Sequence, residues 1–191
     1  MRLFQITPPW NNTGDNPYPW VDSADGLFEP ADIFRLQPLV QDWSVPHLIT
    51  SASSPNLDAY CCPSGLYLFS PMARDVLAPA IDNSAEWLPA EIDGLGEFYI
   101  LHPLRSCSLG PAAQFVRNPV SGNITQIEKY DFQETELQTA AIFYPAQTPG
   151  SAAHAVGSCF RALISTEPSA LLWNRAGLRG VRFEPLANAV E

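Results

Sequence analysis

The sequence has few basic residues and few histidines for its length. Among 191 residues, 10 lysines and arginines stand against 20 aspartates and glutamates, so the formal net charge is -10, and there are three histidines. This charge repels nucleic acid and anionic membranes, so neither is expected as a direct ligand. It would suit a basic protein partner, and it would equally keep a protein without such a partner in solution. Charge alone leaves these two interpretations open.

Long hydrophobic runs and paired cysteines are also missing. No segment approaches the ~20 apolar residues that span a bilayer. The opening MRLFQITPPW has neither the apolar core nor the cleavage site of a signal peptide. The four cysteines are Cys61, Cys62, Cys107 and Cys159, and no two of them have CxxC spacing. We therefore expect reduced thiols and a cytoplasmic protein.

Catalytic, phosphate-binding and metal-binding motifs are absent as well. The sequence contains no GxSxG, no Walker A loop and no GxGxxG. His47, His102 and His154 stand apart, without the HExxH, HxH or HxE spacing that seats a metal. His102 ends an apolar stretch and is expected to pack rather than to act as a base. We expect no enzyme, no cofactor and no metal.

Two alternatives to a binding protein remain open at this point. A small hydrolase or transferase could pair Cys62 or Cys107 with His102 or His154, or use two carboxylates, because such groups meet only in space. Cysteine as a small buried hydrophobic residue is the commoner use. The other alternative is a non-catalytic scaffold subunit that oligomerises through an aromatic loop.

The composition that is present favours one mixed domain. Hydrophobic residues make up 46% of the chain, which is enough to build a core at this length. Nineteen prolines argue against a helical bundle, because proline breaks helix interiors. We predict a single α+β domain over residues 1–191. It should contain short, mainly antiparallel strands and a few short helices, with a loop-rich part over residues 1–60.

Residues 65–89, GLYLFSPMARDVLAPAIDNSAEWLP, are the most informative stretch. An apolar run with strand character leads to Ser70, which can accept from the first free amides of a helix, and to Pro71, which has no amide to lose there. The helical spacing of its apolar residues predicts one buried stripe, made of Met72, Val76, Leu77 and Ala80. The extended piece at Trp87–Pro89 completes a strand–helix–strand unit.

Residues 161–186 resemble a second copy of this unit. Ser165 takes the place of the capping serine, and Gly177 suits a left-handed helix end. The distance from Ser165 to Pro185 nearly equals that from Ser70 to Pro89. Two related units are therefore one interpretation, and two unrelated capped helices are the other.

The remaining patterns predict several further elements. Expected strands lie at residues 2–7, 97–104 and 140–144, with another in SVPHLIT. A hairpin is expected around SGN at 121–123, a helix over 30–42 and a long loop over 8–30.

A candidate contact surface follows from the distribution of acids. From Asp75 to Glu97 there are six acids and no base. A basic partner is therefore expected at the acids Asp82, Glu86, Glu91, Asp93 and Glu97. The aromatic residues Trp10, Tyr18 and Trp20 form a second candidate surface, unless they pin their loop to the core.

The order of landmarks resembles a family of bacterial immunity proteins, family eleven, that accompanies polymorphic toxins. The matching pieces are LYLFSPMARDVLAP, EWLPAEI, EFYILHPLRSCSL, IFY and CFRALIST followed by LLWNRAGLRGVRFEPL. They cover roughly residues 66–186. The sequence departs from the family at residues 105–109, where an aspartate-then-serine signature is expected, and in a longer linker at 145–158.

The resemblance implies a protein that binds a cognate toxin and occludes its active site or functional surface, with no catalysis of its own. The charge adds that the toxin is basic and nuclease-like, since an acidic inhibitor is steered onto a basic target. The oligomeric state is left open.

Overall fold

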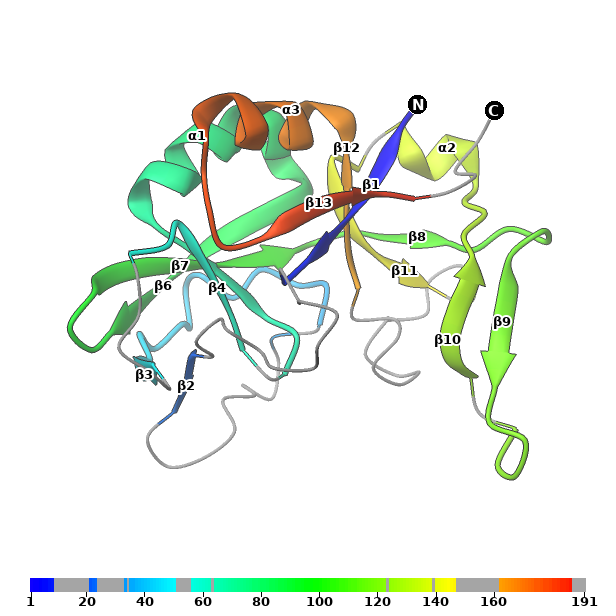
Figure 1. The fold of residues 1–191 in the computed structure, drawn as a ribbon, viewed down its shortest axis with the longest axis horizontal. Coiled ribbons are helices and arrows are strands. Elements are labelled where there is room, and N and C mark those ends of the chain that lie inside the picture. The colour runs from blue at the N-terminus through cyan, green and yellow to red at the C-terminus, as the bar shows by residue number, and fades with distance from the viewer. Residues whose placement is uncertain are drawn as a thin grey trace.

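The computed structural model describes residues 1–8, 21–23, 33, 35–50, 56–62, 64–122, 124–138, 140–146 and 162–186, except for the side chain of Asp82. These residues form an α+β structure of short, mainly antiparallel strands, as the sequence predicts. Two helices lie side by side on one side of the molecule, and the strands run beneath them (Figure 1). None of the helices in this part of the chain combines the length and apolar character needed to cross a bilayer.

The elements are short and alternate along the chain. The strands are β1 (Leu3–Thr7), β2 (Val21–Ser23), β3 (His47–Thr50), β4 (Ala59–Cys61), β5 (Tyr67–Phe69), β6 (Ala85–Ile92), β7 (Gly96–Pro103), β8 (Ser106–Ser108), β9 (Gln114–Arg117), β10 (Ile124–Lys129), β11 (Ile142–Ala146), β12 (Leu163–Thr166) and β13 (Arg182–Pro185). The helices are α1 (Pro71–Ile81), the 3₁₀ turn η1 (Asp82–Ser84), α2 (Glu134–Leu137) and α3 (Glu167–Ala176).

The strands form three sheets. A six-stranded sheet has the order β2-β3-β6-β7-β5-β4, and a five-stranded sheet has the order β13-β1-β12-β11-β8. The strands β9 and β10 pair only with each other. Two pairs are parallel, β3 with β6 and β8 with β11, and the other pairs are antiparallel.

The two ranges singled out in the sequence, 65–89 and 161–186, both fold as strand–helix–strand. In the first, β5 and β6 are parallel and β7 lies between them, antiparallel to both. In the second, β12 and β13 are parallel and β1 lies between them in the same way. The two helices pack together, and Trp173 of α3 meets the ring of Phe69 edge-on at 5.9 Å. Each helix thus bridges two strands across an inserted third strand.

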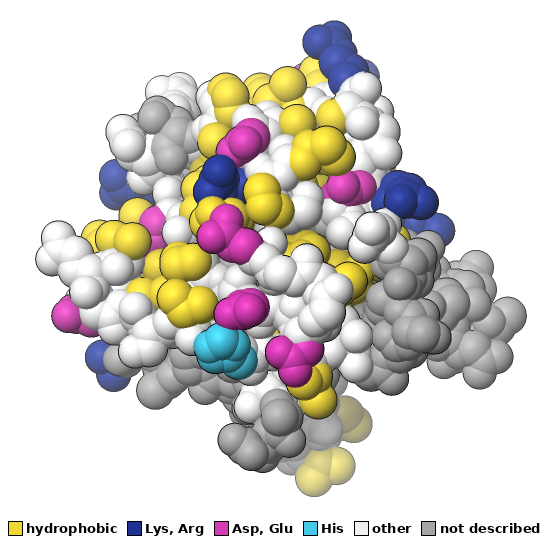
Figure 2. Space-filling model, turned by 90° about the vertical axis from the view of Figure 1, so that its left-hand side faces the viewer, with side chains coloured by type: hydrophobic (Ala, Val, Ile, Leu, Met, Phe, Trp, Pro, Cys, Tyr) yellow, Lys and Arg dark blue, Asp and Glu magenta, His cyan; other side chains and the backbone are white. Residues whose placement is uncertain are grey.

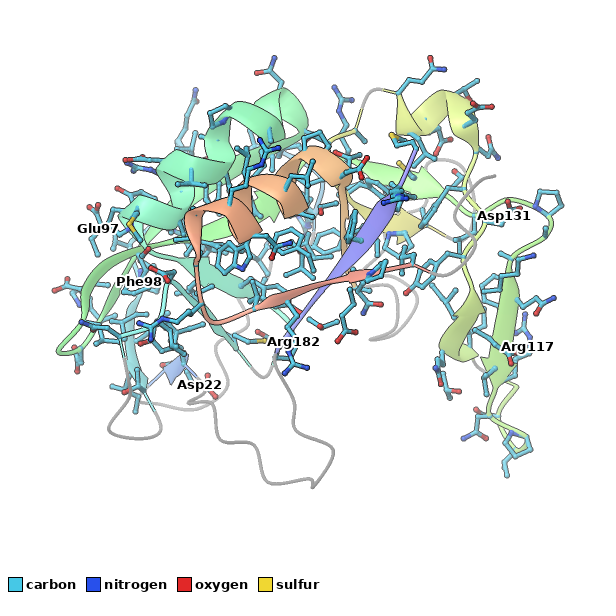
Figure 3. All side chains as sticks on the ribbon, turned by 45° about the horizontal axis from the view of Figure 1, so that its top comes forward. Asp22, Glu97, Phe98, Arg117, Asp131 and Arg182 are labelled. Atoms are coloured by element: carbon cyan, nitrogen blue, oxygen red, sulfur yellow. The ribbon has the colours of Figure 1, made fainter. Side chains whose placement is uncertain are left out.

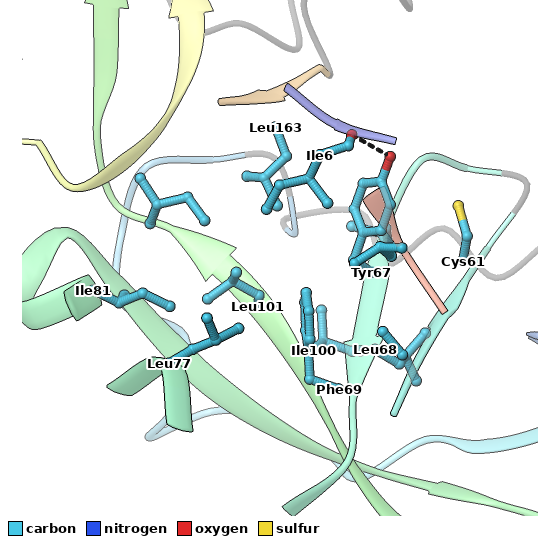
Figure 4. Close-up of a cluster of buried hydrophobic side chains, with 14 of the residues drawn as sticks. Ile6, Cys61, Tyr67, Leu68, Phe69, Leu77, Ile81, Ile100, Leu101 and Leu163 are labelled. Carbon is cyan, nitrogen blue, oxygen red and sulfur yellow. Dashed lines mark hydrogen bonds between the residues drawn. The ribbon is translucent and has the colours of Figure 1, made fainter. Parts of the chain in front are cut away.

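Helix α1 begins as predicted but buries a different stripe. The amide of Ala73 donates to Ser70 Oγ at 3.2 Å, and Pro71 is the first helical residue. The buried side chains are Ala73, Leu77 and Ile81, whereas Met72 is 56% exposed. The predicted stripe was therefore about one residue out of phase. The sheet sets the phase, because Leu77 and Ile81 pack toward Leu101 of β7 (Figure 4).

Helix α3 is not capped by Ser165, which corrects the sequence prediction. Ser165 lies inside β12, fully buried and paired with Phe4 and Ile142. Thr166 occupies the capping position, but its hydroxyl donates to the carbonyl of Ala141 at 3.3 Å instead of accepting from the helix. Pairing with two neighbouring strands extends β12 by one residue and moves the helix start. Gly177 ends α3 in the left-handed conformation, at φ 66°, as predicted.

The two large sheets are joined by buried contacts. The hydroxyl of Tyr67 in β5 donates to the carbonyl of Ile6 in β1 at 2.8 Å (Figure 4). On the other side, the carbonyl of Arg179 accepts from the amides of Asp58 and Ala59 at 2.8 and 3.0 Å. Gly180 follows at φ 119°, and a Cβ atom there would lie 2.0 Å from the carbonyl oxygen of Ala59. Only glycine allows the α3–β13 connection to approach β4 this closely.

The remaining expectations have mixed outcomes. The strands expected near residues 2–7, 47–50, 97–104 and 140–144 are present, as is the hairpin around 121–123. The helix expected over 30–42 is wrong for the described part of that range, which contains bends and turns. Its chain is instead held by side chains of the sheet, including the carboxylate of Glu86. The long loop expected over 8–30 contains the strand β2, and most of its other residues lie outside the described part.

Candidate functional site

The β6–β7 hairpin brings three of the predicted contact residues together at its end. Its register places Glu91 directly opposite Glu97, and Asp93 lies in the connecting turn. Gly94 and Gly96 form this turn with positive φ angles of 74° and 87°. Residues with a side chain rarely adopt such angles. All three acids are exposed. We refer to Glu91, Asp93 and Glu97 as the acidic end.

The carboxylates of the acidic end turn to different neighbours. Glu91 Oε2 lies 3.3 Å from Nδ1 of His47 on the adjacent strand β3. Glu97 accepts a hydrogen bond from the hydroxyl of Tyr99, two residues along the same strand. The backbone amide of Asp93 donates to the carbonyl of Leu48 at 2.8 Å, which fixes the turn against β3. Contacts with strands β3 and β7 thus hold the acidic end.

Helix α1 begins beside this hairpin and adds a further acid. The guanidinium of Arg74 lies 4.1 Å from the centre of the Tyr99 ring and donates to Asp75 at 2.8 and 3.0 Å. The hydrogen bond to Asp75 raises the pKa of Arg74, and the bond to Glu97 raises the pKa of Tyr99. Glu97 lies next to the start of α1 in Figure 3, at the end of the molecule opposite Arg117.

Exposed apolar side chains surround the acids on this face. Met72 at the start of α1 is 56% exposed, and Ile49 of β3 is 39% exposed. Ile49 lies two residues from His47 and therefore on the same face of β3. Figure 2 looks at this side of the molecule, and acidic side chains lie there among hydrophobic ones. Carboxylates mixed with apolar groups form a surface that can bind a basic protein.

Glu86 does not belong to this surface, which corrects its prediction as a contact residue. Its side chain is 12% exposed and accepts from His102 Nδ1 and from the amide of Leu39, at 2.8 and 2.6 Å, with Val40 at 3.4 Å. The other ring nitrogen of His102 meets the carbonyl of Arg35 at 2.8 Å. Both ring nitrogens of His102 thus face an oxygen of another element. The Glu86–His102 pair therefore fastens residues 35–40 to the base of the hairpin.

The side chains of the other predicted contact residues lie outside the described part of the structure. Asp82 lies in η1, but its side chain is outside the described part of the structure. Trp10, Tyr18 and Trp20 lie outside the described residues altogether. The surface predicted for the aromatic loop thus stays a prediction.

The described cysteines are buried and poorly suited to nucleophilic chemistry. Burial raises the pKa of Cys61 and of Cys107 to about 12, and it raises the pKa of Cys62 well above its ordinary value. Both ring nitrogens of His102 are bonded to other groups and His47 pairs with Glu91. Among the described residues, therefore, no thiol is hydrogen-bonded to an imidazole. The same residues include no group of three acids, histidines or cysteines placed to hold a metal ion.

In comparisons with known proteins, no family model and no curated protein sequence matches the chain. Two carboxylates face each other across β6 and β7, but they are exposed at a hairpin end and bonded to different neighbours. This arrangement is suited to contacting a cationic surface.

Proposed function

We propose that this protein is an immunity protein that binds a cognate bacterial toxin and neutralises it by covering its active site or functional surface. The observation that carries the proposal is the acidic end of the β6–β7 hairpin. Like charges placed directly opposite one another on paired strands destabilise a sheet, by roughly 0.2–1 kcal/mol. A partner that supplies the missing positive charge removes this cost on binding. The partner is accordingly a basic protein, of the kind that acts on nucleic acid.

The rigidity of the acidic end supports the same proposal. The hairpin that carries it has eight residues in each strand and lies in the middle of a six-stranded sheet. Its charges are thus held in position before binding, so little ordering entropy is lost on association. A net charge of -10 speeds the encounter with a basic partner and makes its rate depend on salt.

The resemblance to immunity protein family eleven supports the proposal independently of charge. Its landmarks fall on the elements from β5 to β13, including both strand–helix–strand units and the hairpin strands β6 and β7. The hairpin that carries the acidic end is among them, whereas the neighbouring strand β3 lies outside the resemblance. The buried thiols give no comparable support to a hydrolase or transferase.

The first experiment is co-expression with the product of the adjacent upstream reading frame, followed by calorimetry of the purified pair. We expect rescue of growth and tight one-to-one binding. The variant Glu91→Lys/Asp93→Lys/Glu97→Lys should weaken binding by roughly 100-fold or more, mainly through a slower, less salt-dependent association. The matched control is Glu128→Lys/Glu134→Lys/Glu184→Lys, which makes the same charge change at exposed acids elsewhere. It should change affinity by less than about threefold.

The outcomes separate the role from the surface. Tight binding that both triple variants retain would keep the immunity role and remove the acidic end as the contact site. Absence of both binding and rescue would contradict the immunity role itself. Loss of affinity in both variants would show that the total charge matters rather than the acidic end.

A further inference from the structure

A pocket of about 420 Å³ opens where three helical ends meet, well away from the acidic end. It lies between the end of α1, the turn η1, the end of α2 and the start of α3. Its volume is within the range of ligand-binding pockets, roughly 300–1,000 Å³. Nothing in the proposed toxin contact uses it.

The walls of the pocket are mostly apolar. Ile81 at the end of α1, Leu137 of α2 and Pro168 of α3 line it together with small alanine side chains. Uncharged polar groups are contributed by Asn83 and Gln138. An apolar molecule with one polar group would match this lining.

Among the described residues that line the pocket, Arg105 has the only charged side chain, and Met1 with its terminal ammonium group lines the pocket as well. No acid is among the described residues that line it, although acids outnumber bases two to one in the chain. The backbone at Arg105 is fixed, because its carbonyl accepts from the amide of Tyr144 at 3.1 Å and the preceding amide of Leu104 donates to Ser84. Its guanidinium forms no hydrogen bond or ion pair with the described residues. An exposed cation thus stands at the pocket, and no described residue uses its donors.

Guanidinium chemistry determines which ligand such a pocket would take. The planar fork of an arginine matches the two oxygens of a carboxylate and binds both at once. The apolar walls would cover the rest of the molecule. We propose that this pocket binds a small organic carboxylate with an apolar body, its carboxylate on Arg105. The proposal does not depend on the toxin-binding role.

The test uses phenylacetate and hexanoate as probes in two-dimensional amide NMR spectra of the ¹⁵N-labelled full chain. Both should cause saturable shifts at Asn83, Gln138 and Ala141, with dissociation constants of about 1–10 mM. Phenylacetamide has the same shape without the charge, and inorganic phosphate has the charge without the apolar body. Each should bind at least about tenfold more weakly than phenylacetate.

Variants of two arginines then assign the carboxylate contact. Arg105→Gln should weaken phenylacetate binding by at least about tenfold, and Arg105→Lys should have an intermediate effect because it keeps the charge but loses the fork. Arg117→Gln is the matched control, since Arg117 is exposed on the distant β9–β10 hairpin (Figure 3). It should bind phenylacetate like the unmodified protein.

Several results would overturn the proposal. They are the absence of saturable shifts at these amides up to about 20 mM of either carboxylate, equal binding of phenylacetamide or phosphate, and unchanged binding in Arg105→Gln. If Arg105→Gln fails to fold, the comparison of probes and Arg105→Lys still decides the matter.

Discussion

The two long hairpins of this protein, β6–β7 and β9–β10, differ in how they are supported. The first lies inside a six-stranded sheet, with buried residues such as Leu88 and Ile100 along most of its length. The second is a sheet of two strands, and most of its residues are exposed. It projects from the opposite end of the molecule (Figure 1). Ile127 is the one buried side chain in its two strands, and the stacked rings of Tyr130 and Phe132 connect it to the core.

The charges on the two hairpins follow this difference in support. On β6–β7, Glu91 stands opposite Glu97, an arrangement that a sheet tolerates only at a cost in stability. On β9–β10, Arg117 stands opposite Ile124 and Lys129 opposite Gln114, so no like charges face each other. An isolated two-stranded hairpin is only marginally stable, so it tolerates little repulsion between its strands. The repulsive charges therefore lie where the surrounding sheet can hold them.

The largest expected effect tests the difference in support directly. Ile100→Ala in β7 should lower the free energy of unfolding by about 3 kcal/mol, because Ile100 is fully buried and its loss leaves a cavity. Ile124→Ala in β10 removes the same atoms from a half-buried position and should cost about 1 kcal/mol or less. Urea unfolding of both variants measures the two values. Equal losses would mean that β9–β10 is as firmly integrated as β6–β7.

The second effect concerns the base of the β6–β7 hairpin. Glu86→Ala should cost roughly 2–3 kcal/mol, because it leaves His102 and the amide of Leu39 without their buried acceptor. Glu128→Ala on β10 removes an exposed acid and should change stability by less than about 0.5 kcal/mol. A double-mutant cycle with His102→Ala isolates the pair, and coupling near zero would contradict its role as a fastening.

Much of the β6–β7 hairpin could be predicted from the sequence. The dense aromatic and branched residues of EFYILHPL indicate β7, and EWLPAEI with a following Asp-Gly pair indicates β6 and a turn. A turn centred on Gly94 places residues at equal distances on either side opposite each other. This arithmetic would have paired Glu91 with Glu97 and also Glu86 with His102. The pairing of Glu86 with His102 could thus have been predicted, but only once the register of β6 and β7 was known.

Other features depend on contacts that local sequence does not encode. Ser165 looks like a helix cap, yet pairing with β1 and β11 draws it into a strand. Met72 fits an apolar stripe, yet the sheet selects the row through Ala73 instead. The place of Arg105 at the pocket gives no sequence signal, because the described lining residues come from five separate segments of the chain.

The smallest expected effect sharpens the contrast between the two carboxylates of the acidic end. Neutral Tyr99 donates to Glu97, whereas ionised Tyr99 would repel it, which is why the pKa of Tyr99 is raised. Glu97→Gln removes this charge and should lower the pKa of Tyr99 toward the ordinary value of about 10. Glu91→Gln removes an acid that pairs with His47 instead, so it should shift the pKa of Tyr99 much less.

The same shift sets the direction of the pH dependence. Because folding raises the pKa of Tyr99, the stability linked to this group is present below the ordinary tyrosine pKa and is lost as the pH rises through the folded value. In Glu97→Gln that alkaline loss should begin at the same pH, because the unfolded chain is unchanged in this respect, but it should end at lower pH and be smaller. Ring-proton NMR of Tyr99 between about pH 8 and 12 follows both variants. A pKa that falls equally in Glu91→Gln would mean that the acidic end acts on Tyr99 as one diffuse field and not through the bond from Glu97.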